Sequence, residues 1–272
     1  MYKVITMDRR ALRNKAMKQT KKRITQELAS RDNVIVQAVK SIDELDKAAN
    51  LLLEHVRDWY AIYFPELARS VREADDYLTL MLALKKRERF TKDAIKKAVG
   101  EKDYAERLSE QAKRSMGYNL SEEDLNEIFG MAEHVVTLRR ERDHINTYLE
   151  KVMTEEAPNV SAVIGTTIGA RLISIAGSLN RLASFPSSTV QVLGAEKALF
   201  AHLRKGTPSP KYGVIFSYPQ LHNAPLKKRG KIARHVAAKI AIAAKVDYFH
   251  GKYVGDKLAA DLEKHISEIV SR

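Results

Sequence analysis

The chain has 272 residues, a formal net charge of +13 and no cysteine. The lack of cysteine excludes disulfide cross-links, thiolate catalysis and Cys-ligated zinc or iron–sulfur sites. A hydrophobic share of 44% argues against wholesale disorder. No apolar run approaches the roughly 18 residues of a membrane span, and the start lacks the apolar segment of a signal peptide. We therefore expect a cytoplasmic protein of one or two domains with no membrane contact.

The first thirty residues are basic and mostly helix-forming, although the pattern also permits a short strand at Tyr2–Thr6. This segment, residues 1–31, is too short to hold a core of its own. We interpret it as a helical lead-in or as the end of something larger.

A coiled-coil seam follows, because apolar residues alternate at spacings of four and three. It consists of Ala38, Ile42, Leu45, Ala49, Leu52, Val56, Trp59 and Tyr63. The pattern predicts one helix over Asp32–Tyr63, which Pro65 ends or kinks, and a second helix over Glu66–Leu84. Residues 85–117, at the tip, read as short helices that end in a break at Gly117.

A second long helix is predicted to begin after Ser121, which can cap it together with Asp124, and to end near Glu156. Its apolar stripe needs a partner, and the earlier seam is the natural one. We therefore expect an antiparallel coiled coil over residues 32–157. The stripe consists of Leu125, Ile128, Ala132, Val135, Leu138, Arg142, Ile145, Leu149 and Val152.

Pro158 marks a boundary, after which residues 158–272 read as a compact helical domain. Its glycine-rich start, Val160–Leu182, predicts close contact between helices. Three further helices are expected, together with two loops and one short strand. The first helix is opened by Gly194–Lys197 and ends near Lys205, with Gly206 closing it; the other two are Lys227–Lys245 and Asp256–Val270. The loops are Thr207–Lys211 and Pro219–Pro225, and the strand is Tyr212–Ser217. The fold class is therefore all-α, with at most a short β element.

Positive charge is concentrated between residues 157 and 246, which hold thirteen Lys and Arg and one acid, Glu196. Such a field attracts polyanions, of which RNA and DNA are the commonest. The alternative is a merely solvated basic face, but ordinary solvated faces mix both signs.

The candidate contact residues lie near two predicted helix starts, where free backbone N–H groups also favour phosphate. They are Gln191, Gly194, Ala195, Glu196, Lys197, Arg204, Lys205, Lys227, Lys228, Arg229, Lys231 and Arg234. Glycine at 194 lets a partner approach the backbone. Glu196 either bonds a partner or meets the positive end of its own helix, and Leu199 and Phe200 are expected in the core.

Catalytic and metal-binding motifs are absent from the sequence. The eight histidines show no ligand spacing, and no glycine-rich phosphate loop or nucleophile elbow occurs. We expect no metal site, no cofactor bound by this chain and no enzymatic activity.

Four ordered motifs closely resemble the Nop domain, and two upstream stretches resemble the coiled-coil region of the same family. The motifs are Gly169–Ala183, Pro186–Phe200, Pro210–Gly213 and Arg229–Arg234, and the upstream stretches are Val34–Val39 and Arg57–Leu67. The resemblance covers about residues 32–247 and points to an archaeal box C/D ribonucleoprotein core protein.

The resemblance implies a non-catalytic scaffold. Its Nop domain would bind a box C/D guide RNA already held by an L7-type kink-turn-binding protein. Its coiled coil would form a homodimer. We assign that contact to Ile42, Leu45, Leu52, Val56, Leu125, Ile128, Val135 and Leu138. The family's N-terminal domain holds fibrillarin, which methylates RNA with S-adenosylmethionine, so that cofactor is expected on the partner.

Two departures from the family pattern affect these expectations. Ala201 stands where the family often has Arg, so Arg204 would have to replace that RNA contact. Residues 1–31 are shorter than the family's N-terminal domain, which implies a smaller fibrillarin contact or none.

Three other functions stay open. The first is a coiled-coil adaptor that binds an acidic protein. The second is a nucleic-acid-modifying enzyme whose site has no recognisable motif, and the third is the spliceosomal factor of the same family. The absence of long eukaryotic extensions argues against the last, and a nucleolar location would apply only to a eukaryotic chain.

Overall fold

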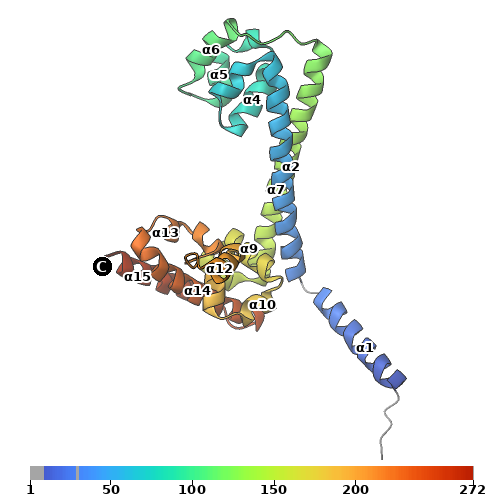
Figure 1. Cartoon of the computed structure of the whole chain (residues 1–272), viewed down its shortest axis with the longest axis vertical. Coiled ribbons are helices and arrows are strands. Elements are labelled where there is room, and N and C mark those ends of the chain that lie inside the picture. Colours follow the sequence, from blue (N-terminus) through green and yellow to red (C-terminus); the bar gives the residue numbers. More distant parts are fainter. Residues whose placement is uncertain (1–8, 29–30, 272) are drawn as a thin grey trace, which may run out of the picture. The chain divides into compact units, whose positions relative to one another are not determined.

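The computed structural model describes residues 9–28 and 31–271, and the strand expected at Tyr2–Thr6 lies outside them. Within these residues the regular structure is entirely helical, with no β-strand (Figure 1). The chain divides into two compact units, residues 41–146 and the rest, of which 147–271 form the larger part. Among the described helices none is long and apolar enough alone to cross a membrane; only the sharply bent pair of segments at 158–164 and 166–176 meets that test jointly.

The N-terminal part agrees with the expected helices. Helix α1 spans Arg9–Leu28 and α2 spans Asp32–Tyr63. At Phe64 the backbone leaves helical geometry, with φ −140° and ψ 76°, and Pro65 begins the next helix. The proline therefore ends α2, as its missing N–H and its restriction on the preceding residue require.

The helix predicted over Glu66–Leu84 is wrong as a single element, because it is two helices. They are α3, Pro65–Ser70, and α4, Ala74–Leu84. Between them Val71 is extended and fully buried. Arg57 of α2 donates a 3.0 Å hydrogen bond to the carbonyl of Arg72, which satisfies a backbone group in the break.

Short helices form the tip, as expected: α5, Lys92–Val99, and α6, Ala105–Lys113, with a 3₁₀ turn at Arg87–Arg89. Gly117 closes the tip against the end of α2. A Cβ atom there would lie 1.9 Å from the carbonyl oxygen of Tyr63. Arg87 donates to the Gly117 carbonyl at 2.9 Å and covers the Tyr63 ring at 4.4 Å. The break at Gly117 is therefore a close backbone contact that only glycine permits.

Helix α7, Glu122–Glu156, begins with the predicted cap. The Asp124 N–H donates to Ser121 Oγ at 3.1 Å, and the Ser121 N–H donates to Asp124 Oδ2 at 3.1 Å. This reciprocal capping box satisfies two N–H groups that the helix itself leaves without acceptors.

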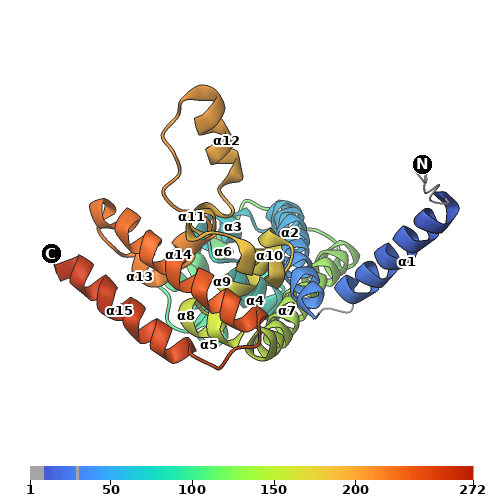
Figure 2. The ribbon, with the colours of Figure 1, turned by 90° about the horizontal axis from the view of Figure 1, so that it is seen from below.

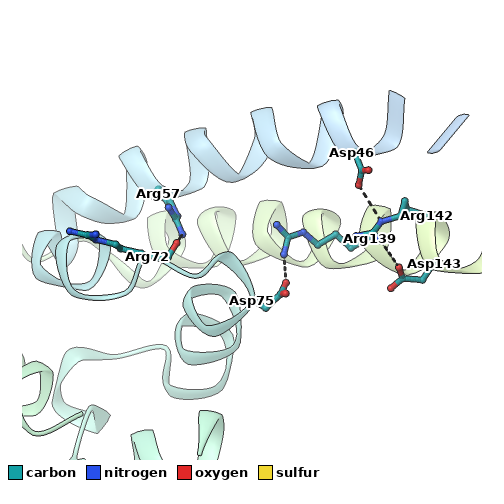
Figure 3. A network of polar contacts seen from close by, with 7 residues as sticks. All are labelled: Asp46, Arg57, Arg72, Asp75, Arg139, Arg142 and Asp143. Carbon is teal, nitrogen blue, oxygen red and sulfur yellow. Dashed lines mark hydrogen bonds and ion pairs between the residues drawn. The ribbon is translucent and has the colours of Figure 1, made fainter. Parts of the chain in front are cut away.

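Within residues 41–146, α2 and α7 run antiparallel (Figure 1). Asp46 pairs with Arg142 at 3.1 Å, whereas Tyr60, further along α2, lies 6.2 Å from Phe129, which precedes Arg142 on α7. Figure 3 shows this polar contact beside the ion pair between Arg139 and Asp75. The antiparallel pairing is thus made inside one chain.

The residues that we assigned to dimerisation divide into two groups. Val56, Leu125, Ile128 and Val135 are buried inside one chain, whereas Ile42, Leu45, Leu52 and Leu138 are half-buried. The seam also drifts: Leu53 and Tyr60 are buried, and Trp59 is 36% exposed. An α-helix makes slightly less than two turns in seven residues, so a 3.5-residue stripe rotates off one face. Homodimerisation itself stays a prediction.

The C-terminal part consists of short helices around one long one, and the structure gives their bounds as α8, Pro158–Ile164; α9, Thr166–Ala176; α10, Leu179–Ser184; α11, Ser187–Val192; α12, Glu196–Lys205; α13, Pro219–His222; α14, Leu226–Tyr248; and α15, Gly255–Ser271. Helix α14 contacts α8, α10, α11 and α15. Its inward face is fully buried, as expected from Ala233, Val236, Ala237, Ile240 and Ala244.

Buried acids join these helices. Asp247 Oδ1 accepts from the Asn159 N–H at 3.0 Å, and its Oδ2 accepts from the Val160 N–H at 2.9 Å. Asp32 Oδ2 accepts from the Leu179 N–H at 2.8 Å. Each carboxylate meets the start of a helix, where free N–H groups and the helix dipole favour negative charge.

Three expectations for this part need correction. The glycines of Val160–Leu182 have two roles, since Gly169 makes the expected close contact, whereas Gly165 and Gly177 have positive φ and end helices. Tyr212–Ser217 is not a strand but contains a 3₁₀ turn, Val214–Ser217. Its Gly213 and Val214 N–H groups donate to the carbonyls of Gln191 and Leu193, which fixes a tight turn instead of a ladder. The loop expected at Pro219–Pro225 contains α13.

Candidate nucleic-acid interface

Helix α12 has no buried residue, and Figure 2 shows it standing away from α11, α13 and α14. Lys197, Arg204 and Lys205 are exposed on it. Together with Phe200 and Ala201 they line a shallow depression of about 400 Å³. A basic helix held out in this way presents Lys197, Arg204 and Lys205 to a partner.

The expectation that Phe200 lies in the core is wrong, and Leu199 is only half-buried. Phe200 is 58% exposed, and its neighbour Leu203 is 69% exposed. Because α12 projects from the domain, no face of it meets the core. Exposed large apolar side chains that sit among cations mark an interaction surface more often than a solvated one.

The turn before α12 explains Gly194 and Glu196. Gly194 has φ +87°, and a Cβ atom there would lie 2.5 Å from Cγ2 of Val214. Its N–H donates to Glu196 Oε1 at 2.7 Å. Ala195 is the residue before the first turn and has no capping side chain. The structure therefore gives Glu196 a local role in closing the turn, and its contact with a partner stays a prediction.

Gln191 also has an internal role. Its Nε2 donates to the Lys211 carbonyl at 2.7 Å, and its own carbonyl accepts from the Gly213 N–H at 2.9 Å. These two bonds hold the end of the loop Thr207–Lys211 against α11. The Gln191 side chain therefore acts mainly by holding the loop beside the candidate interface in place.

The cations at the start of α14 also separate into two kinds. Lys227, Lys231 and Arg234 share one face, since they are spaced four and three residues apart. They are exposed and have no ion-pair partner among residues 9–28 and 31–271. The same absence holds, within those ranges, for Lys197, Arg204 and Lys205 on α12.

Lys228 and Arg229, by contrast, bond to carbonyls of their own unit. Lys228 Nζ donates to the Val270 carbonyl at 2.7 Å. Arg229 Nε donates to the Ala224 carbonyl at 2.8 Å, and its second guanidinium nitrogen donates to His222 at 2.8 Å. Arg229 therefore fixes the end of α13, and its contact with RNA stays a prediction.

A groove of about 540 Å³ lies between α14 and α15. Its cationic side is formed by Lys227, Lys228, Lys231 and Arg234, and its opposite side includes Glu268. Inside it the rings of His235 and His265 stack with their centroids 5.1 Å apart. The sequence analysis missed this pair because thirty residues separate the two histidines and no local motif joins them.

His235 makes the charge of the groove depend on pH. Burial lowers the pKa of His235 below its ordinary value, and the neighbouring His265, Lys239 and Arg234 lower it further. Asp261, which pairs with Lys239, opposes this change. His235 is therefore neutral at pH 7 and becomes a cation only in acid.

An aromatic column was also missed. The rings of Tyr212 and Phe216 stack 4.6 Å apart, His222 follows at 4.8 Å, and the Arg229 guanidinium lies 5.4 Å over Phe216. In a strand Tyr212 and Phe216 would lie far apart along one face. The 3₁₀ turn brings them together, so the wrong prediction of a strand concealed the column.

In the described part of the chain, no three His, Asp or Glu residues converge on one point.

Comparison with known proteins gives consistent matches. A family model described as "Nop: snoRNA binding domain, fibrillarin" matches residues 41–268. An archaeal NOP5 family protein from Methanocaldococcus jannaschii is 47% identical over 250 residues, which cover 92% of this chain and 60% of that protein. Human nucleolar protein 56 is 38% identical over 87% of this chain and 41% of its own length. The chain thus spans less than two thirds of both relatives.

A solved structure extends the likeness to the fold. It is described as the crystal structure of a fibrillarin/Nop5p complex, and the match has a TM-score of 0.52 at 27% identity. The match covers 96% of this chain and 78% of the other.

Proposed function

Because this chain belongs to the Nop family, we propose that it is the RNA-binding scaffold of a box C/D ribonucleoprotein. One observation carries the proposal. Six cations on α12 and α14 are exposed without an acid partner in the described residues, on the part of the chain that has almost no acids. Unpaired exposed cations are what a phosphate backbone neutralises when it binds.

Helix α12 supports a composite partner made of RNA and protein. Lys197, Arg204 and Lys205 suit phosphates, whereas Phe200 and Leu203 offer apolar area that RNA phosphates do not use. The expected partner is a guide RNA held by an L7-type kink-turn-binding protein. Ala201 and Arg204 lie one turn apart on the same face, so Arg204 can reach where the family's Arg would lie.

The rest of the scaffold role rests on the same family membership. Fibrillarin would carry S-adenosylmethionine and methylate the target RNA, while this chain supplies no catalytic group. The homodimer would use the half-buried seam residues Ile42, Leu45, Leu52 and Leu138, whose apolar surface one chain leaves incompletely covered. In an archaeal cell this particle would act in the cytoplasm.

The test measures binding to a kink-turn RNA, with and without the L7-type protein, over a range of salt concentrations. The variant K227Q/K231Q/R234Q should weaken binding and make the salt slope less steep by about 2 to 3, since each lost phosphate contact removes about 0.7 to 0.9. The control K92Q/K96Q/K97Q removes the same charge from α5 and should leave the slope unchanged.

The adaptor hypothesis predicts a different outcome. If the basic surface grips an acidic protein, the wild-type chain will not bind the RNA tightly even with the L7-type protein present. Methyl transfer by this chain alone, without fibrillarin, would refute the scaffold role.

A further inference from the structure

Helix α1 carries a second, separate concentration of positive charge. Residues 9–26 hold eight cations and no acid, whereas residues 27–156 hold 21 cations and 27 acids. The cations are Arg9, Arg10, Arg13, Lys15, Lys18, Lys21, Lys22 and Arg23. The match of the family model begins at residue 41, after α1.

The side chains described on α1, residues 12–21, are all exposed and form no continuous apolar stripe. Leu12 and Met17 are five positions apart, which places them on different sides of the helix. A helix that lies in a membrane surface needs such a stripe. The eight cations instead favour a partner that is recognised through charge.

The spacing of the cations along α1 is unfavourable by itself. Arg9 and Arg13, and Lys18 and Lys22, are four residues apart, where like charges repel. The first acid in the helix is Glu27, one turn after Arg23. An anion that lies along the helix would relieve this repulsion, so binding and helix stability would reinforce each other.

We propose that α1 is a second RNA-binding element, which contacts the phosphate backbone of RNA beyond the part held by α12 and α14. This inference rests on the proposed function, because it takes RNA to be the polyanion. At about 1.5 Å per residue the helix is roughly 30 Å long, so it can follow several phosphates. Cations arranged around a helix without a selective groove give affinity without sequence preference.

The experiment compares two RNAs, each in complex with the L7-type protein. The short one contains only the kink-turn, and the long one extends it by a further turn of duplex. The variant R13Q/K15Q/K18Q removes three cations at positions whose side chains are exposed, and glutamine keeps a similar helix propensity. The matched control is again K92Q/K96Q/K97Q on α5.

We expect the variant to bind the long RNA on the order of tenfold more weakly and with a salt slope less steep by about 2 to 3. Its binding to the short RNA should not change. Backbone amides of residues 12–21 should also exchange hydrogen more slowly when the long RNA is bound, but not with the short one.

Three results would overturn the proposal. Unchanged binding of both RNAs would remove α1 from the RNA surface, and loss of fibrillarin capture by the same variant would then assign α1 to a protein partner. Equal weakening of both RNAs would mean that α1 acts generally and not on the extension. If the wild-type chain binds neither RNA, the scaffold function fails together with this inference. If the wild-type chain binds the long RNA tightly but not the short one, the role of α1 is supported and the proposed binding to the kink-turn is refuted.

Discussion

Residues 41–146 and residues 147–271 use similar helices but treat their charges differently. The first region holds 18 cations and 22 acids and pairs cations with acids, as in Arg142–Asp46 and Lys102–Asp76. The second leaves Lys227, Lys231 and Arg234 without partners in the described chain. Exposed ion pairs contribute at most about 1 kcal/mol each. Ion pairing therefore adds little to stability in the first region. Its lack in the second region matters for binding, because unpaired cations remain available to a polyanion.

Figure 3 shows how the first region uses its arginines for structure. Arg57 bonds the Arg72 carbonyl and lies 4.8 Å over the ring of Tyr77. Burial raises the pKa of Tyr77, so its hydroxyl stays neutral beside that guanidinium. The network joins α2 to the break between α3 and α4.

The strongest test of this contrast truncates the core of the first region. Ile128 is fully buried, so Ile128→Ala should lower the free energy of unfolding by about 2–5 kcal/mol in urea titrations. It should leave the salt slope of RNA binding unchanged. The control Ile242→Ala, at an exposed site on α14, should cost less than about 0.5 kcal/mol. A changed slope would mean that the two regions are not independent.

The next test removes a buried charge of the second region, the carboxylate of Asp247, which is not available to RNA. Asp247→Asn places an amide where the carboxylate accepts from the Asn159 and Val160 N–H groups. The unfolding free energy should fall by about 2–3 kcal/mol, since a charged acceptor is lost from a buried site. Asp256→Asn, which is exposed, should cost clearly less. Equal losses would show that burial of the carboxylate is unimportant.

A pH titration examines the groove between α14 and α15. The lowered pKa of His235 means that the unfolded chain binds more protons than the folded one, so stability should decline below about pH 6.5. A bound phosphate favours the protonated ring, so RNA affinity should rise a few-fold over the same window. His235→Gln should flatten both profiles. A wild-type affinity that does not vary between about pH 5 and 8 would exclude a phosphate beside this pair.

The smallest effect on stability is expected on α12. Phe200→Ser should change the unfolding free energy by less than about 0.5 kcal/mol, because the ring is mostly exposed. It should nevertheless weaken binding to the RNA complex that contains the L7-type protein, while binding to RNA alone stays unchanged. Phe249→Ser, at another exposed ring, serves as the control. A large loss of stability would place Phe200 back in a core.

The sequence by itself determined the features that depend on near neighbours. The bounds of α2 and α7, the cap at Ser121 and the close of α12 at Gly206 all follow from helix periodicity, side-chain capping and the left-handed preference of glycine. The location of the positive charge and the resemblance to the Nop family also follow directly from the order of the residues.

Only the tertiary structure decided which side chains remain exposed. It exposed Phe200, bonded Arg229 to the end of α13, converted Tyr212–Ser217 into a turn and stacked His235 on His265. Each of these depends on contacts between segments distant in sequence. Local propensity sets how a segment is shaped, whereas burial and hydrogen bonding between segments decide which of its side chains remain available.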